Sequence, residues 1–358
     1  MQTDMHYYGT YALARAAGIK SEHAGYIATA SQYVDDSKGI TVELPDSSFL
    51  DYRATAHGTS IAIPDIKDTA FNKDEDDQRY VWIPFHFLPA CEGTTLAEKL
   101  ICKIDSAVAN EMVAHHLSLA DQSYGALLMG VTAHVYADTF SHYGFSGVTS
   151  QMNDVDTKSI DLQIQSSNVL QYAKERASDF WEKCKGEGAE KLTLLGHGGA
   201  ATFPDRPFLS WSFNYTDGRK SGLRPNHETF LNACEKLHNM FITLGDKFPG
   251  FSQGDGRGFQ EIKETVSKIL AVEGTMEERI TAWQNAAQSG LLFGNQAGEQ
   301  IPVYDSSKFE NDAKQLSGMT SEKVKGTFVY VFMKAASVHR NYVLQELLPL
   351  HGVDVILP

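Results

Sequence analysis

The sequence predicts a mainly α protein, a single large multi-helix domain with long loops and at most minor β-structure. Apolar residues recur at helical spacing in most of the long segments, and strand-like alternation is confined to short stretches. Of the 358 residues, 42% are hydrophobic and 11% aromatic, which is enough for a sizeable packed core. No apolar run reaches the ~18 residues that a membrane-spanning helix needs.

The first 36 residues are expected to form two helices, over residues 4–17 and 21–34. Apolar residues repeat at helical spacing along the second helix. Asp35 and Asp36 then lie at its C-terminal end, where carboxylates face the negative end of the helix dipole. A cation near these carboxylates would remove that penalty.

Residues 39–80 are expected to be irregular, with minor strands. The aromatic-rich segment over residues 79–89 follows, and Pro84 and Pro89 disfavour a helix there. We therefore expect an extended, buried segment that places His86 among aromatic rings.

The rest of the chain is expected to be helices joined by loops, with a long loop over residues 196–226. Residues 245–258 are the best candidate for a joint, because they are rich in glycine. This gives a metal-binding helical core over residues 1–245 and C-terminal helices over residues 259–358, packed on the same domain. The helices are expected over residues 106–119, 122–143, 161–185, 227–245, 260–272, 276–289 and 321–348.

Charge and cysteine content limit the classes of function. Asp and Glu number 45 and Lys and Arg 31, a net charge of −14, which argues against general nucleic-acid binding, since that needs a basic face. The chain opens without a basic region followed by an apolar stretch, so we expect a cytoplasmic protein. The cysteines show no CxxC spacing, so we expect neither a disulfide framework nor a Cys-type zinc site; they are Cys91, Cys102, Cys184 and Cys234.

The most informative stretch is HVYADTFSH, which carries His134, Asp138 and His142. These residues are spaced four apart, and each such step turns a helix by only ~40°, so all three share one face. The rest of this helix is apolar, and burial of a carboxylate and two imidazoles there is costly unless they are paired or ligated. Imidazole and carboxylate are usual ligands of divalent metals. The alternative is a hydrogen-bonded His–Asp–His network that holds helices together.

Further candidate ligands lie in distant parts of the sequence. Each of them alone has an ordinary interpretation, such as a solvated helix end or a loop residue. Together with the histidine helix they favour a metal site, and they are Asp4, His6, Asp35, Asp36, His86, His197 and Asp205.

Five stretches of the chain resemble DUF6765, a family of bacterial and fungal proteins without an established activity. The resemblance covers most of residues 1–240. The stretches are DMHYYGTYALARAAG at 4–18, SQYVDD at 31–36, PFHFLP at 84–89, HVYADTFSHYGFSG at 134–147 and GHGGAATFPDRP at 196–207.

The order of the candidate ligands is also similar, more distantly, to the superfamily of zinc-dependent phospholipase C and S1/P1 nuclease. Those all-helical enzymes hold three zinc ions. The resemblance implies that fold and a ligand set with Asp138 bridging two metals. Two positions differ. Residue 1 is Met where the superfamily has a ligand Trp, so either Asp4 substitutes or that metal is absent; Ala201 follows His197 at the spacing of a ligand Glu, so the pattern does not establish a third metal. The implied ligands are His6, Asp36 (or Asp35), His86, His134, Asp138, His142 and His197.

This resemblance implies a metal-dependent hydrolase that uses a di- or trinuclear site to activate water, with a phosphoester or other small molecule as substrate. Zinc is the expected metal, with iron and manganese as alternatives. Asp35 or Asp36, whichever is not a ligand, would act as a base, and Arg206 would hold an anionic substrate oxygen. Two alternatives stay open, an iron-dependent oxygenase or lyase at the same site and a non-enzymatic binding protein with a structural His/Asp network. The oligomeric state is not predicted.

Overall fold

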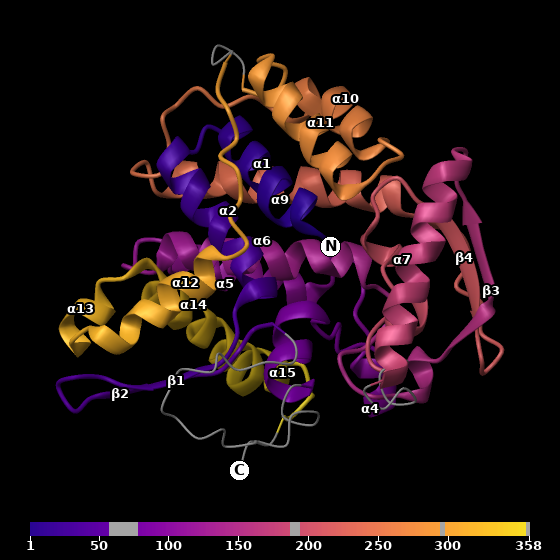
Figure 1. The fold of residues 1–358 in the computed structure, drawn as a ribbon, viewed down its shortest axis with the longest axis horizontal. Coiled ribbons are helices and arrows are strands. Elements are labelled where there is room, and N and C mark those ends of the chain that lie inside the picture. The colour runs from indigo at the N-terminus through magenta and orange to yellow at the C-terminus, as the bar shows by residue number, and fades with distance from the viewer. Residues whose placement is uncertain (57–77, 187–193, 294–297, 356–358) are drawn as a thin grey trace.

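The structure is a computed structural model that describes residues 1–56, 78–186, 194–293 and 298–355 (Figure 1). It is mainly α with two small sheets, as the sequence predicts. The longer helices are α2 (Ser21–Asp36), α5 (Ala107–Ser118), α6 (Gly125–Ser141), α7 (Ser167–Gly186), α9 (Asn226–Lys247), α10 (Phe259–Leu270), α11 (Met276–Gln288) and α14 (Phe328–Tyr342). The shorter ones are α1 (Thr10–Ala16), α4 (Leu96–Lys99), α12 (Lys308–Gln315), α13 (Ser321–Lys325) and α15 (Leu348–Leu350).

Helix α6 forms the centre of the molecule, with α9 on one side and α5 and α14 on the other (Figure 1). All its residues except Ala126 are buried. Helix α2 crosses it closely at Gly130, where a Cβ atom would lie 2.3 Å from the carbonyl oxygen of Ile27. Only glycine permits this approach, which brings the end of α2 beside the polar face of α6.

The C-terminal helices pack against the N-terminal ones. Helix α14 packs on α6, α10 on α9, and α11 on the first helical turn of the chain. Trp283 and Phe332 from the C-terminal part belong to the same buried cluster as Met5 and Leu128. The proposed boundary between residues 245 and 259 stays a prediction. Over the described parts of the chain, no helix has both the length and the apolar composition that crossing a membrane requires.

Two segments that contain candidate ligands form π-helical turns, η1 (Asp4–Gly9) and η2 (Gln78–His86). The expectation of an extended segment over residues 79–89 is therefore wrong for most of its length. Pro84 lies inside η2, and burial of Ile83 and Phe85 in the core offsets the hydrogen bond that proline cannot make. A third such turn, η7 (Val343–Leu347), lies near the C-terminus.

The β-structure consists of a hairpin of β1 (Ile40–Glu43) and β2 (Phe49–Tyr52) and an antiparallel sheet in the order β3-β4-β5. The sheet strands are β3 (Val155–Gln163), β4 (Ser210–Tyr215) and β5 (Arg224–Pro225), and α7 lies against the sheet (Figure 1).

The expected loop over residues 196–226 thus contains two strands, and the helix expected from residue 161 begins at Ser167. Residues 196–226 also contain the 3₁₀ turns η4 (Gly198–Ala200) and η5 (Phe203–Asp205). Two further 3₁₀ turns elsewhere in the chain are η3 (Gln151–Asn153) and η6 (Leu316–Gly318).

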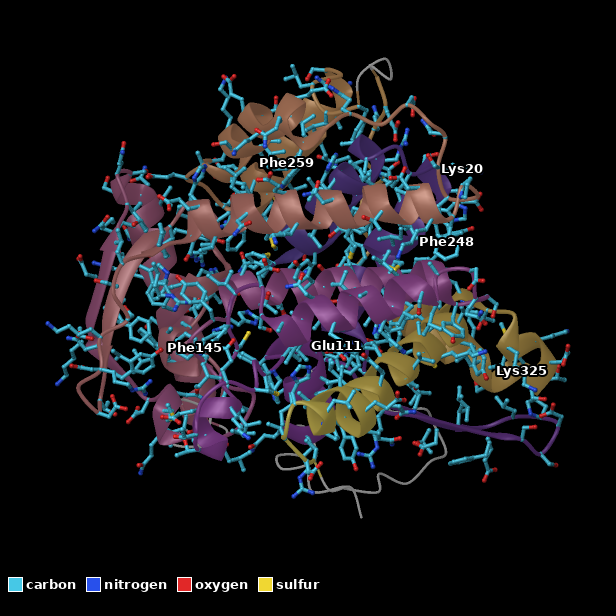
Figure 2. The ribbon with its side chains drawn as sticks, turned by 180° about the vertical axis from the view of Figure 1, so that it is seen from behind. Lys20, Glu111, Phe145, Phe248, Phe259 and Lys325 are labelled. Carbon is cyan, nitrogen blue, oxygen red and sulfur yellow. The ribbon has the colours of Figure 1, made fainter. Side chains whose placement is uncertain are left out.

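A second hydrophobic cluster joins this sheet to the central helices. The side chain of Phe145, which follows α6, lies beside the sheet in Figure 2 and stacks on Phe213, with 5.7 Å between the ring centroids. Alternate residues of β4 point into the cluster, and these are Trp211, Phe213 and Tyr215. The aromatic side chains of this segment therefore pack rather than face a ligand.

The cysteines show no sign of disulfide bonding in the described residues. Cys91, Cys102 and Cys234 are free thiols, and burial raises the pKa of Cys91 to about 11. The side chain of Cys184 lies outside the described residues.

Two buried histidines join α5 to α14. His339 Nε2 donates to the carbonyl oxygen of Pro84 over 2.7 Å, so its Nδ1 accepts from His116 Nε2 over 2.9 Å. Burial lowers the pKa of His339 to about 3 and holds the pKa of His116 well below its usual value. Both imidazoles are therefore neutral in the folded protein.

We expect acid to destabilise the metal-free protein through these histidines. Unfolded imidazoles take up a proton near pH 6.5, whereas His339 resists protonation down to about pH 3. The unfolded state binds more protons between these values, so the free energy of unfolding falls as the pH drops through this window, by up to about 1.4 kcal/mol per pH unit for each histidine. Urea titrations in chelator from pH 7 downwards measure the slope.

His339→Gln should make that slope shallower. The control is His351→Gln, since His351 is partly exposed and bonds Glu111 at the surface over 2.8 Å. Equal slopes for the wild type and His339→Gln would contradict the prediction.

Candidate metal centre

Histidine and aspartate side chains from five segments of the chain meet beside α6. Their ligand atoms form three groups, in each of which all atoms lie within 4.8 Å of one another. The first group is His6, His134 and Asp138; the second is Asp35, His86 and His134; the third is His142, His197 and Asp205.

Asp138 links these groups. Its side chain is 2% exposed, and each of its oxygens faces nitrogen atoms. Oδ1 lies 3.2 Å from His6 Nε2, while Oδ2 lies 3.2 Å from His134 Nε2 and 3.5 Å from His86 Nδ1. Burial would raise the pKa of Asp138, but interactions with His142, the Met1 amino group and the other surrounding histidines outweigh burial and hold this pKa well below its usual value. The carboxylate is therefore ionised.

Backbone carbonyls fix the tautomers of the two central histidines. His134 Nδ1 donates to the carbonyl oxygen of Ser31 over 2.8 Å, and His86 Nε2 donates to that of Thr55 over 2.9 Å. When both rings are neutral, each turns a nitrogen without hydrogen toward the centre. Burial would lower the pKa of His86, but its hydrogen bond to Asp138 and the charge of Asp35 outweigh burial and raise this pKa, so in the absence of a metal ion a proton on His86 can take the place of one. These two nitrogens lie 3.3 Å apart, and Asp35 Oδ1 lies 3.8 Å from one and 3.9 Å from the other. Electron-pair donors crowd together here, and such a cluster needs a cation.

The third group repeats this arrangement. His142 Nδ1 donates to the carbonyl oxygen of His86 over 2.7 Å, and His197 Nδ1 donates to that of Ala201 over 2.7 Å. Their Nε2 atoms face Asp205, at 3.0 Å from Oδ1 and 3.7 Å from Oδ2 respectively. Burial lowers the pKa of His197 to about 4, so its neutral imidazole presents a lone pair to this carboxylate, whereas His142 Nε2 lies at hydrogen-bond distance from it.

The ring nitrogens of His6 are also buried without partners in the described part of the chain. His6 is 1% exposed and stacks on His134 with 3.8 Å between centroids, yet neither ring nitrogen has a hydrogen-bond partner among the described residues. Burial, reinforced by His134, lowers the pKa of His6 to about 4, so the ring is neutral near pH 7. Asp138 Oδ2 is likewise buried without a hydrogen bond. These orphaned atoms fit the ligand set of a divalent metal.

The amino group of Met1 also lies in the centre. It donates to Asp138 Oδ1 over 2.6 Å and lies 3.2 Å from Asp205 Oδ1. Burial disfavours the ammonium form, but Asp138 and Asp205 outweigh burial and raise the pKa of this amine to about 11. Among the described residues it bonds no imidazole, so it leaves the His86–His134 pair without a cation. The position of this amino group in the centre could not be predicted from the spacing of side chains in the sequence.

Three predicted residues lie outside the groups. Asp36 accepts hydrogen bonds from the Tyr304 hydroxyl and from Gln32, because adjacent helix residues point ~100° apart and only Asp35 faces the centre. Asp4 pairs with Arg279 Nε over 2.7 Å. Arg206 is buried next to Asp205, and its Nη2 donates to Thr202 Oγ1 over 3.1 Å.

The carboxylate beside His197 belongs to Asp205, and residue 201 is an alanine. Ala201 has φ 48° and ψ −130°, a conformation that favours glycine, and it holds His197 through its carbonyl oxygen. Strained backbone of this kind is found at functional sites, where the surrounding structure maintains it.

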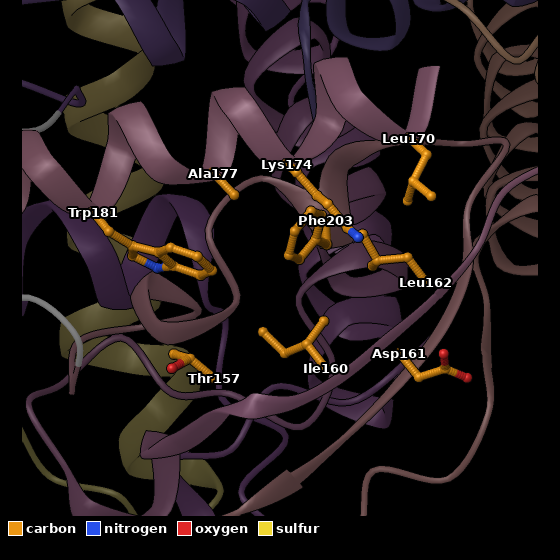
Figure 3. Close-up of a pocket in the computed structure, with 9 residues that line it drawn as sticks. All are labelled: Thr157, Ile160, Asp161, Leu162, Leu170, Lys174, Ala177, Trp181 and Phe203. Atoms are coloured by element: carbon orange, nitrogen blue, oxygen red, sulfur yellow. The ribbon is translucent and has the colours of Figure 1, made fainter. Parts of the chain in front are cut away.

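A cavity of about 290 Å³ borders the loop that carries the third group (Figure 3). It lies between β3 and α7, and Figure 3 shows Ile160 and Leu162 of β3 directed toward α7, whereas Asp161 points away. Trp181 Nε1 donates to the carbonyl oxygen of Gly198 over 3.3 Å, which ties the cavity wall to this loop. The lining residues are Thr157, Ile160, Asp161, Leu162, Leu170, Lys174, Ala177, Trp181 and Phe203.

Comparison with known proteins gives a family but no activity. The model of a family of unknown function, DUF6765, matches residues 1–347. The chain belongs to the DUF6765 family. The match contains all eight residues of the three groups. No curated protein and no solved structure matches the chain, so the chemistry of this DUF6765 protein has to be argued from its own residues.

We expect Ala201→Gly to be less destabilising than Ala200→Gly, by about 1 kcal/mol or more, because strained residues cost 1–3 kcal/mol. Both alanines are fully buried and lose the same methyl group, but only Ala201 has a positive φ among these two. Urea unfolding of the two variants measures the difference. Equal losses would contradict backbone strain at this position.

Proposed function

We propose that this DUF6765 protein is a metal-dependent hydrolase of phosphoesters, with a centre of two or three divalent ions. The observation that carries the proposal is the arrangement of His86 Nδ1 and His134 Nε2. Their lone pairs meet at 3.3 Å and face the carboxylates of Asp35 and Asp138. With both rings neutral, the carbonyl contacts have taken their hydrogens and this space holds acceptors alone among the described residues. A cation has to balance them, and it is either a metal ion or a proton on His86, whose pKa the nearby carboxylates raise in spite of burial.

The donor set suits zinc. Imidazole nitrogen and carboxylate oxygen are its usual ligands, and each central histidine has the carbonyl partner that orients metal-binding imidazoles. His6 and Asp138 would complete the set that His86, His134 and Asp35 begin. Iron chemistry would use the same donors, so identification of the metal separates a hydrolase from an oxygenase.

Bound metals would lower the pKa of a coordinated water and stabilise the charge that develops on phosphoryl oxygens. Asp36 is the carboxylate left to accept a proton, because it lies next to Asp35 and outside the ligand groups. Its side chain bonds Tyr304 and Gln32, so it would have to turn from these partners toward the centre to do so. Burial, partly offset by the Tyr304 hydroxyl, raises the pKa of Asp36 to about 6, which is close to the value that suits a general base near neutral pH.

The similarity in ligand order to the zinc-dependent phospholipase C and S1/P1 nuclease superfamily supports the proposal. The early histidine, the HxxxD helix and the later histidines of that pattern correspond to His6, His134 with Asp138, and His142 with His197. Asp205 takes the place of the carboxylate that the pattern expects at residue 201.

We expect protein purified without chelator to contain stoichiometric metal. His134→Ala and Asp138→Ala should weaken its binding by more than about a hundredfold, the upper range for loss of a partner outside the ligand set. Elemental analysis gives the metal and its stoichiometry, and the release of p-nitrophenol from bis(p-nitrophenyl) phosphate reports hydrolysis.

Asp36→Asn is the matched control, since it should keep the metal and lose hydrolysis. Metal-free wild type with no affinity for zinc would contradict the proposal. So would alanine variants that lose stability while they keep the metal.

A further inference from the structure

Arg206 is a buried cation without a counter-ion. It is 2% exposed, and its guanidinium lies 5.4 Å from the centre of the Tyr172 ring. Its Nη2 donates to the Thr202 hydroxyl over 3.1 Å, and the guanidinium also hydrogen-bonds the side chain of Tyr172, but its Nε has no hydrogen-bond partner in the described part of the chain. Among the residues that the structure describes, no carboxylate oxygen lies within 4.0 Å of this guanidinium, although Asp205 is the preceding residue.

Other buried arginines are better satisfied. Arg279 pairs with Asp4 over 2.7 Å and donates to a backbone carbonyl over 3.2 Å. Arg224 and Arg340 each donate to at least two backbone carbonyl oxygens. Arg206 has neither kind of partner within the described residues. A structural role alone does not explain why a buried guanidinium has neither a carboxylate nor a backbone carbonyl of these residues as its partner.

The surroundings of Arg206 add positive charge. The Arg279 guanidinium lies close enough to repel Arg206 electrostatically, while the Tyr172 side chain and the Asp205 carboxylate offset part of this repulsion. The carboxylate of Asp205 already faces the Met1 amino group at 3.2 Å and His142 at 3.0 Å. Burial of a charge costs several kcal/mol unless it is paired, so a bound anion would remove a penalty that the protein alone does not offset.

We propose that Arg206 binds a phosphate group of the substrate, beside the third ligand group. This inference rests on the proposed hydrolase function and names the substrate moiety. The Asp205 carboxylate is close enough to the Arg206 guanidinium to act on it electrostatically, so an anion held by Arg206 lies near the site that Asp205, His142 and His197 form. Thr202 fixes one end of the planar guanidinium and leaves Nε to donate.

The test measures binding of inorganic phosphate to the full chain by calorimetry, both with zinc and after chelator treatment. Arg206→Met should weaken phosphate binding by about ten- to a hundredfold, the usual range for one charge-assisted hydrogen bond. Arg206→Lys should recover only part of the affinity, because lysine keeps the charge without the planar donors. Arg219→Met is the control, since that half-exposed arginine pairs with Asp217 at the surface over 2.7 Å.

Thermal unfolding without phosphate gives an independent check. Arg206→Met should be at least as stable as the wild type, because it removes a buried unpaired charge. Marked destabilisation, or phosphate binding equal to the wild type, would overturn the inference, and so would tighter binding of acetate than of phosphate. A protein that binds phosphate through Arg206 but holds no metal would contradict the proposed function alone.

Discussion

The ionised carboxylate of Asp138, buried among imidazoles, is the interaction on which the arrangement of the central helices depends. A charge in the middle of an apolar helix is tolerated only if partners surround it, and His6, His86, His134 and His142 all lie within 3.6 Å of its oxygens. These partners come from η1, η2 and α6 itself. The fold therefore has to bring its first residues and its π-helical turns to the same face of α6.

Close packing meets this requirement. Gly130 lets α2 approach α6, and one turn further along α6 the ring of His134 reaches the carbonyl oxygen of Ser31 on α2. Asp35, at the end of α2, then faces the centre. The second hydrophobic cluster, which contains Phe87 and Phe203, supports the loop with His197 and Asp205 from the other side. Apolar contacts thus set the positions of the polar ligands.

Much of this could be predicted from the sequence. The spacing of His134, Asp138 and His142 predicts one polar helix face, because the period of the helix is fixed. The choice between Asp35 and Asp36 could not be made, since both lie at a helix end whose rotation depends on packing against α6. The π-helical form of residues 78–86 was also missed, because the local effect of Pro84 is weaker than the burial of its aromatic neighbours. Strand β4 showed the alternation of Trp211, Phe213 and Tyr215, but glycines and prolines around it favoured a loop.

The hydrogen bond from His142 to the backbone of His86 joins the second and third ligand groups through one peptide unit. His86 presents its ring to one group and its carbonyl oxygen to a histidine of the other. An ion that immobilised the His86 ring would therefore also orient His142, and a second ion would meet a group whose ordering entropy had already been lost. Uptake of metal should consequently be cooperative, with the half-loaded protein the least populated species.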